Sequence, residues 1–363
     1  MEICKRCVMD TTDKDIKFDA EGICNHCRGF EKSRGVVIRP YNEWIGIVEK
    51  IKEMNKKKSY DCVIGISGGV DSSYMAYQAH KHGLRAILVH FDNGWDSEEA
   101  RDNIQKIIKY TNYDYKLIAC DQEEFYDIQR AYMKAGVLNW EVISDMAIAA
   151  ATYNIAIKDK IKFLLSGSNL NSEGIMPRSW VYAIQDSRNL QDIYKKFGSY
   201  EKIETLPIIS YYRRLYHEKI AKDVKRIKML NYLDYNRELA IKEMAKLFKW
   251  KDCGEKHYES VWTRFYQAYV LPTRFGVDKR KAHYSALINS GQMTRKEALN
   301  LLKNPAYDLK QLKRDKKEVL SRLNISEEEF EEIMTQPIRE HTEFKNVAVM
   351  VKLFQSLFRR GMY

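Results

Sequence analysis

The sequence predicts an α/β fold with a parallel sheet, preceded by a small cysteine-rich module and followed by a helical region. Three observations lead to this prediction. Short apolar runs alternate with helical patterns between about residues 60 and 166, which is typical of βαβ units. Four cysteines lie within the first 27 residues, and the strand signal fades after about residue 215. We therefore divide the chain into residues 1–36, 37–215 and 216–363.

Composition and charge predict a globular protein with a basic surface. Hydrophobic residues make up 45% of the chain and charged residues 31%, and the longest weakly polar stretch, 147–157, is too short to span a bilayer. The chain starts without an apolar signal region, so we expect a cytoplasmic protein that binds no membrane. The net charge of +11 fits an anionic partner, either nucleotide-like molecules or a nucleic acid. A basic surface without a specific partner stays an alternative.

The first module has the cysteine spacing of a zinc site. Cys4 and Cys7 form one C-x2-C pair, and Cys24 and Cys27 form a second pair after sixteen residues. Four thiolates complete a tetrahedron and leave no open position, so we expect a structural metal and no catalytic one. His26 is interpreted as a neighbour of the ligands. An odd total of seven cysteines and a reducing compartment argue against a disulfide framework.

The elements of the α/β region follow in order. A helix is expected first, at 41–58. Strands are expected where β-branched and apolar residues cluster, at 62–66, 86–91, 116–120 and 162–166. Between and after them we expect helices at 71–82, 96–110, 123–135 and 141–158. Asp96 and Glu99 have the spacing of a capping box. After residue 215 we expect only helices, rich in lysine, arginine and aromatic residues.

The turn that follows the first strand carries the most informative motif. It runs Ser67, Gly68, Gly69, Val70, Asp71, Ser72 and opens a helix. Such a turn offers backbone N–H groups and the positive end of the helix dipole to a phosphate. The glycines let phosphate oxygens approach, and the serines add hydroxyl donors. Because Asp71 would repel phosphate directly, we expect it to hold a magnesium ion. An ordinary glycine-containing turn is the alternative.

This spacing excludes two common phosphate loops. A Walker loop needs a Lys-Ser/Thr pair after its last glycine, and a dinucleotide loop needs G-x-G-x-x-G. The turn instead resembles S-G-G-x-D-S, the PP-loop of the ATP pyrophosphatase superfamily. The resemblance implies an adenine nucleotide alpha hydrolase-like domain whose loop holds the β- and γ-phosphates of ATP. It also implies adenylation of a substrate oxygen with release of pyrophosphate, after which ammonia or a sulfur donor displaces AMP. Ser67, Asp71 and Ser72 are the expected catalytic residues.

Two further stretches end strands at the edge where open α/β sheets bind ligands. The second strand ends at Phe91 and Asp92, where the superfamily places residues beside adenosine. A later strand is followed by Gly167, Ser168 and Asn169, which we expect to contact ATP, and by Glu173, which we expect to contact the substrate. An ordinary polar loop is the alternative for both stretches.

Longer stretches are similar to one family of this superfamily. CKRCVMDTTDKDIKFDAEGICNHC, SGSNLNSEG, MPRSW and LPTRFGVDKRKAHYSALINSGQMTRKEAL resemble the N-acetyl sugar amidotransferases, over nearly the whole chain. Members act in bacterial surface-polysaccharide synthesis, including that of lipopolysaccharide O-antigen. The resemblance implies that ATP activates the acetamido oxygen of a nucleotide-linked N-acetyl sugar, and that ammonia replaces it to give an acetamidino group.

On this interpretation, the late basic motif binds an anionic substrate. Its cations are Arg274, Lys279, Arg280, Lys281 and His283, and they would pair with a diphosphate or a uronate. Arg178 and Trp180 of MPRSW would hold sugar or uracil. A solvated basic helix end and a packed tryptophan are the respective alternatives.

Two other functions remain as alternatives. Zinc-ribbon PP-loop enzymes also thiolate tRNA, but they use a reactive cysteine pair, whereas Cys62, Cys120 and Cys253 are single. We therefore do not expect nucleic acid as the partner, although a role for Cys120 at the functional edge stays open. A catalytically silent ATP-binding protein is disfavoured because the loop motif is intact.

The ammonia is expected from a partner protein. A glutaminase needs a nucleophilic cysteine, but residue 2 is Glu2 and no cysteine lies in a glycine-flanked elbow. The resemblance implies a separate glutaminase and a barrel-type partner that channels ammonia. Finally, a helix is expected near 344–360, with one apolar face that packs on the protein or on a partner.

Overall fold

The computed structural model describes residues 2–182, 186–254 and 258–347. Its centre is a five-stranded sheet in the order β3-β2-β1-β4-β5. The strands are β1 Cys62–Gly65, β2 Ala86–Asp92, β3 Asp114–Ala119, β4 Phe163–Ser166 and β5 Lys225–Lys228. All four pairings are parallel, so the carboxyl ends of the strands meet at one edge. The predicted parallel α/β fold is confirmed.

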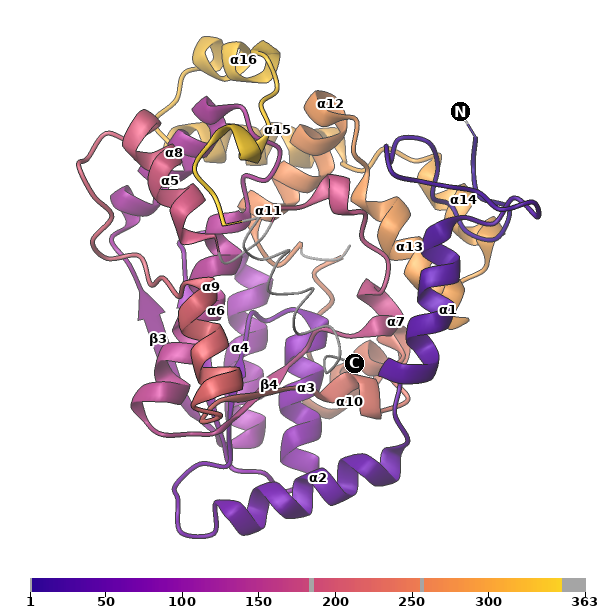
Figure 1. Cartoon of the computed structure of the whole chain (residues 1–363), viewed down its shortest axis with the longest axis vertical. Coiled ribbons are helices and arrows are strands. Elements are labelled where there is room, and N and C mark those ends of the chain that lie inside the picture. The colour runs from indigo at the N-terminus through magenta and orange to yellow at the C-terminus, as the bar shows by residue number, and fades with distance from the viewer. Residues whose placement is uncertain (1, 183–185, 255–257, 348–363) are drawn as a thin grey trace.

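Helices cover both faces of this sheet (Figure 1). The first part of the chain contributes α1 Asn25–Val37, α2 Tyr41–Met54, α3 Val70–Lys81, α4 Glu98–Thr111, α5 Gln122–Ala135, α6 Val142–Lys158 and α7 Leu170–Glu173. Further on lie α8 Ser187–Phe197, α9 Tyr211–Leu215, α10 Arg237–Phe248, α11 Val261–Phe265, α12 Leu271–Phe275, α13 Lys279–Ser290, α14 Arg295–Leu302, α15 Leu309–Arg322 and α16 Glu327–Thr335. None of these helices combines the length and apolar composition that crossing a bilayer requires.

Alternation along the central strand explains the two layers. Val63 of β1 is buried in a core that includes α6, whereas Cys62 and Ile64 are buried in a second core with α3 and α4. Because successive side chains of a strand point to opposite faces, this short run supplies both cores. β1 lies between β2 and β4, so the chain reverses its direction of strand addition here, where open sheets leave a crevice.

Several local expectations are corrected. The N-cap of α4 is Ser97, whose Oγ accepts from the Ala100 N–H at 3.1 Å, because Asp96 turns toward His90 instead. A strand, β5, lies beyond residue 215 in the region expected to be helical. Its sequence, KRIK, contains one apolar residue, so it carries no recognisable strand pattern. Most of the helix expected near 344–360 falls outside the described residues.

Candidate active site and metal site

The phosphate loop lies between β1 and α3. Gly68 has a φ of +78°, and a Cβ at this position would lie 2.3 Å from the carbonyl oxygen of Ala100, so only glycine fits. Gly69 is the N-cap of α3 and provides no side-chain cap. The first N–H groups of α3 therefore stay available to an anion, as a phosphate-binding loop requires.

The serines of the loop hold its shape. The Ser72 hydroxyl accepts from the Ser67 N–H at 3.2 Å and lies 3.2 Å from the Ser67 hydroxyl. The Ser67 hydroxyl in turn accepts from the Gly69 N–H at 3.3 Å. Because these bonds are local, the loop is formed before any phosphate binds. Its hydroxyl groups face the same crevice as the helix N-terminus.

Asp71 is oriented by a residue distant in sequence. The Tyr235 hydroxyl donates a hydrogen bond to Oδ1 of Asp71. Burial, and then the charge of Asp71, raise the pKa of Tyr235 well above its ordinary value, so the phenol stays a donor. Asp71 lines the crevice in the first turn of α3. A carboxylate held here has the donor chemistry that Mg²⁺ prefers.

A cavity of about 550 Å³ opens at this edge of the sheet. Ten of the residues predicted to form the site line it: Ser67, Gly69, Val70, Asp71, Ser72, Phe91, Gly167, Ser168, Glu173 and Lys279. Eight others do not line it: Gly68, Asp92, Asn169, Arg178, Trp180, Arg274, Arg280 and His283. The nucleotide half of the predicted site is thus brought together, whereas most of the substrate half is not.

Most cations of the late basic motif bind protein atoms instead. Arg274 donates to the Met334 carbonyl at 2.7 Å, and Arg280 donates to Asp278 at 2.8 Å. The ammonium of Lys281 lies 2.5 Å from Asp10 of the cysteine module. Only Lys279 reaches the cavity, where its Nζ lies 3.2 Å from Oε2 of Glu141.

The MPRSW stretch is similarly drawn into the protein. Trp180 is 2% exposed and belongs to the main core, which agrees with the alternative interpretation of a packed tryptophan. Ser179 donates to Asp13 of the cysteine module at 2.7 Å. Arg178 is exposed outside the cavity. Asn169 accepts from the Ser172 N–H at 2.8 Å and so caps α7.

Sequence reasoning missed His90 at the floor of the cavity. Its Nδ1 lies 2.8 Å from the Ile66 carbonyl oxygen and its Nε2 lies 2.7 Å from Oδ2 of Asp96. Burial opposes a charge here, but the hydrogen bond to Asp96 and its charge raise the pKa of His90 above its ordinary value. Both ring nitrogens face acceptors, so the protonated imidazole could donate a hydrogen bond from each. The only sequence signal for this pair is its spacing: His90 lies on β2, and Asp96 follows six residues later in the next loop.

Glu259 was also missed, and it touches the phosphate loop directly. Its Oε1 accepts from the Ser67 hydroxyl at 3.3 Å. A Cβ on Gly69 would lie 2.7 Å from the same oxygen, so the carboxylate lies against the loop. The Glu259 carbonyl accepts from the Ser97 N–H at 2.8 Å, which anchors this segment beside β2. Two carboxylates therefore lie at the loop: Asp71 from the first half of the chain and Glu259 from the second half.

Asp145 enters the cavity from α6. Protein atoms surround this residue, but its side chain is exposed where it faces the open cavity. Burial and the charge of Glu141 raise the pKa of Asp145 to about 7, and Lys279 opposes this effect. A carboxyl group with such a pKa can accept or release a proton near neutral pH.

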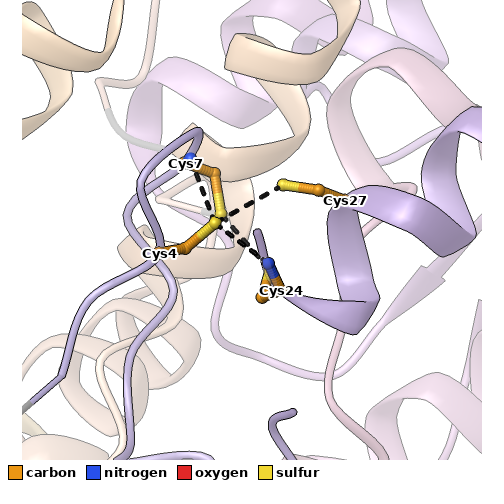
Figure 2. Close-up of side chains that lie close together, drawn as sticks. All are labelled: Cys4, Cys7, Cys24 and Cys27. Carbon is orange, nitrogen blue, oxygen red and sulfur yellow. Dashed lines mark hydrogen bonds between the residues drawn. The ribbon is translucent and has the colours of Figure 1, made fainter. Parts of the chain in front are cut away.

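The four cysteines of the N-terminal module converge as predicted (Figure 2). All are fully buried, and their sulfurs lie within 4.8 Å of one another. The Cys4–Cys27 and Cys7–Cys24 sulfurs are 4.0 Å and 3.7 Å apart. A tetrahedral zinc site with Zn–S bonds of about 2.3 Å has sulfurs about 3.8 Å apart. The four thiols therefore can hold a zinc ion, in a site without an open position.

His26 takes no part in this cluster. Its Nε2 lies 2.6 Å from Oδ2 of Asp13. The structure thus leaves His26 outside the set of four ligands, as expected.

The cysteine module is attached to helices of the late region, beside α13 and α14 (Figure 1). Nδ2 of Asn289 on α13 donates to the Cys27 sulfur at 3.2 Å. Arg295 of α14 donates to the carbonyl oxygens of Cys4 and Cys7, each at 3.0 Å. A metal bound to the cysteines would therefore fix the helix that carries Lys279.

The remaining cysteines differ in position. Cys62 is buried in the sheet, Cys120 lies outside the cavity, and Cys253 lines the cavity. Burial raises the pKa of both Cys120 and Cys253 to about 12. Neither is a thiolate at neutral pH, and no hydrogen bond joins any two of the three among the described residues.

Two family models match parts of the chain. Residues 259–358 match the C-terminal domain of WbpG-like lipopolysaccharide biosynthesis proteins. Residues 58–173 match thiamine biosynthesis protein ThiI. No match was found among curated proteins.

Solved structures of low similarity include two NAD synthetases and an NMN synthetase. An NH3-dependent NAD synthetase from Campylobacter jejuni is 15% identical, with a TM-score of 0.30, over 43% of this chain and 72% of that one. An NMN synthetase from Francisella tularensis is 18% identical, with a TM-score of 0.31, over 80% and 94%. An NAD+ synthetase from Burkholderia pseudomallei is 14% identical, with a TM-score of 0.30, over 80% and 97%.

Proposed function

We propose that this chain, a member of the PP-loop ATP pyrophosphatase superfamily, is an ATP-dependent amidotransferase of lipopolysaccharide biosynthesis. It would convert the acetamido group of a nucleotide-linked N-acetyl sugar into an acetamidino group. One observation carries the proposal. The cavity is lined both by the phosphate loop and by Glu259, Thr263, Gln267 and Lys279, which belong to the segment similar to WbpG-like proteins.

The proposed reaction has two steps. The acetamido oxygen attacks the α-phosphorus of ATP, so that an O–P bond forms, the bond from the α-phosphorus to the bridging oxygen breaks, and pyrophosphate leaves. Ammonia then attacks the activated carbon, so that a C–N bond forms, the C–O bond breaks, and AMP leaves with the former amide oxygen. The attacking nitrogen gives up one proton on the way to the amidinium product.

The residues of the loop suit the first step. The N–H groups at the start of α3 and the hydroxyls of Ser67 and Ser72 would hold the β- and γ-phosphates. Asp71 would hold a magnesium ion, which neutralises charge on the phosphates when bound. Since the loop is already hydrogen-bonded in this shape, little reorganisation is needed when ATP binds.

Asp145 suits the second step. Its side chain lines the cavity near the Glu141–Lys279 ion pair, and its pKa of about 7 fits a proton acceptor. We propose that Asp145 takes the proton that the attacking nitrogen releases. Such a base contributes roughly 10²- to 10⁴-fold to a rate.

tRNA thiolation remains a second candidate, because residues 58–173 match ThiI. The cysteines count against it. Thiolation by this superfamily needs a reactive pair, whereas the pKa of Cys253, the cysteine in the cavity, is raised to about 12 by burial.

Mass spectrometry tests the proposal. Purified protein is incubated with ATP, ammonium and a panel of UDP-linked N-acetyl sugars, and we expect a product in which NH replaces one oxygen, together with AMP. ATP–pyrophosphate exchange is measured in parallel with the sugars and with tRNA. Exchange that depends on tRNA, with no amidino product from any sugar, would overturn the proposal in favour of thiolation.

The nitrogen source is a further part of this proposal. We expect the protein alone to use ammonium but not glutamine, and to use glutamine once a glutaminase and its barrel-type partner are added. Glutamate release by this chain alone, at the rate of product formation, would contradict this. A reaction on ATP and a nucleotide-linked sugar would take place in the cytoplasm, where both substrates are made.

A further inference from the structure

β5 carries two cations on one face of the sheet, of which Arg226 lines the cavity and Lys228, two residues on, does not. Arg226 and Lys228 are two residues apart, so their side chains leave the strand on the same face. Ile227 between them is 4% exposed and is buried in the core on the opposite face. In the sheet register, Arg226 of β5 lies opposite Leu164 of β4, which belongs to the core on the α6 side. Arg226 also lines the cavity.

Neither cation is neutralised by the protein. Within the described ranges, no carboxylate lies within ion-pair distance of Arg226 or Lys228. Burial, and then the charge of Arg226, lower the pKa of Lys228, whereas Glu173 opposes this effect. The two side chains start about 7 Å apart along the strand and repel each other. An anion between them would relieve that repulsion.

This position is separate from the phosphate loop. The loop follows β1, and β4 lies between β1 and β5. Neighbouring strands are about 4.8 Å apart, so β5 lies about 10 Å from β1 across the edge of the sheet. The cavity therefore offers two separate places to phosphate groups: the N–H groups of the phosphate loop, proposed above to hold the β- and γ-phosphates of ATP, and the cations of β5.

The other cations at the cavity have protein partners. Lys279 lies 3.2 Å from Glu141, and Arg237 lies 3.2 Å from Asp252. The predicted diphosphate ligands Arg274 and Arg280 do not line the cavity. Among the Lys and Arg residues that the structure places in the cavity wall, Arg226 alone has no carboxylate partner.

We infer that Arg226 and Lys228 form a second anion subsite, which binds the diphosphate of a nucleoside diphosphate-linked substrate. The inference deepens the proposed function and rests on it for the identity of the ligand. A diphosphate offers adjacent negative charges, which match a guanidinium that binds two oxygens and an ammonium that binds one. The subsite would hold the substrate with its sugar directed toward the phosphate loop.

The test is a binding measurement without turnover. The wild-type protein is titrated with UDP by calorimetry while a non-hydrolysable ATP analogue saturates the phosphate loop. We expect Arg226→Ala and Lys228→Ala each to weaken UDP binding about 10- to 100-fold, the effect of losing charge-assisted hydrogen bonds. Affinity for the ATP analogue, titrated alone, should stay unchanged.

Lys225→Ala is the matched control, because Lys225 is on the same strand but shares the face of Ile227. It removes the same charge and should leave UDP affinity at the wild-type value. UMP is the second control, and the two variants should abolish the preference for UDP over UMP. Arg226→Lys, which keeps the charge, should retain part of the affinity.

Three results would overturn the inference. One is wild-type protein that does not bind UDP, and another is UDP affinity that is unchanged in both alanine variants. The third is a loss of affinity for the ATP analogue, which would assign the cations to ATP. Failure of the proposed function is a different result, namely normal UDP binding by wild-type protein that forms no amidino product.

Discussion

The cysteine module and the phosphate loop each place a site at the start of a helix. In the module, Cys24 is the N-cap of α1 and Cys27 lies in its first turn. In the loop, Gly69 is the N-cap of α3 and Asp71 lies in its first turn. All four cysteine side chains are fully buried, whereas Asp71 lines an open cavity. One helix start is thus closed by the protein and the other is left for a ligand.

The side chains at the start of each helix determine whether the site is closed or open to a ligand. Four thiols satisfy the coordination of a metal completely, so the module has only a structural use. Two glycines leave N–H groups uncovered, so the loop has room for phosphate. The two sites meet at α13, where Asn289 contacts Cys27 and Lys279 enters the cavity. The closed site therefore supports the open one.

The largest effect is expected from removing the metal. Cys27→Ala should release zinc and unfold the module, because binding of a structural zinc contributes about 10 to 16 kcal/mol to the folding of small zinc modules. Elemental analysis should find one zinc per chain in wild-type protein and less in the variant, with a lower melting temperature. His26→Gln is the control and should keep its zinc. Wild-type protein without zinc, or with the absorbance of an iron–sulfur cluster, would contradict this prediction.

A change in the open site should affect catalysis alone. Asp71→Asn should lower ATP–pyrophosphate exchange roughly 10³-fold, because a carboxylate that holds magnesium at the phosphates is lost. Its melting temperature should stay near that of wild-type protein, which contrasts with the cysteine variant. Tyr235→Phe, which removes only the hydrogen bond to Asp71, should have a smaller effect. Near-normal exchange in folded Asp71→Asn protein would end this assignment.

Asp145 separates the two chemical steps. Asp145→Asn should slow the release of amidino product and AMP roughly 10²-fold while ATP–pyrophosphate exchange is retained, because only proton removal from the attacking nitrogen in the second step is affected. In wild-type protein, product formation should rise with pH through about 7, where the Asp145 carboxyl loses its proton. Ser144→Ala, a change at a neighbouring residue of the cavity wall, should keep the wild-type profile. An unchanged pH profile in Asp145→Asn would exclude Asp145 as the base.

The same pKa has a consequence for stability. Folding raises the pKa of Asp145, so the folded protein binds more protons than the unfolded chain between about pH 4 and 7, and stability falls as pH rises through this range. Asp145→Asn removes the titrating carboxyl group and therefore this fall in stability with rising pH. We therefore expect the variant to melt at a higher temperature than wild-type protein at pH 8, and the difference to shrink toward pH 4.

The smallest effect is expected at the link between the sites. Lys281→Ala breaks the ion pair with the buried Asp10 and leaves that carboxylate without its cation, which costs about 1 to 3 kcal/mol. Because α13 also carries Lys279, the KM for the sugar should rise several-fold while the KM for ATP stays constant. Lys296→Ala on the exposed side of α14 is the control. Equal changes in both KM values would mean that the module does not act through α13.

Patterns within short segments were sufficient for much of this structure. The C-x2-C pairs predicted the four-cysteine cluster, because each pair needs only one turn of backbone to bring its sulfurs together. The motif Ser67–Ser72 correctly predicted a loop between a strand and a helix, because the residues of this loop form hydrogen bonds with one another. β5 was not predictable in this way, because an edge strand with one buried side chain has no alternating pattern.

The sequence by itself determined the chemistry that is local: the metal ligands, the phosphate loop and the parallel α/β core. Only the tertiary structure decided which distant groups join that chemistry. It brings Glu259 to Gly69 and Tyr235 to Asp71, and it turns Arg274 and Lys281 toward protein acceptors. The physical reason is that a charged side chain has many possible partners, and packing of remote elements selects among them. A basic motif therefore shows that anions will be bound, but its contacts show whether they belong to a ligand or to the protein itself.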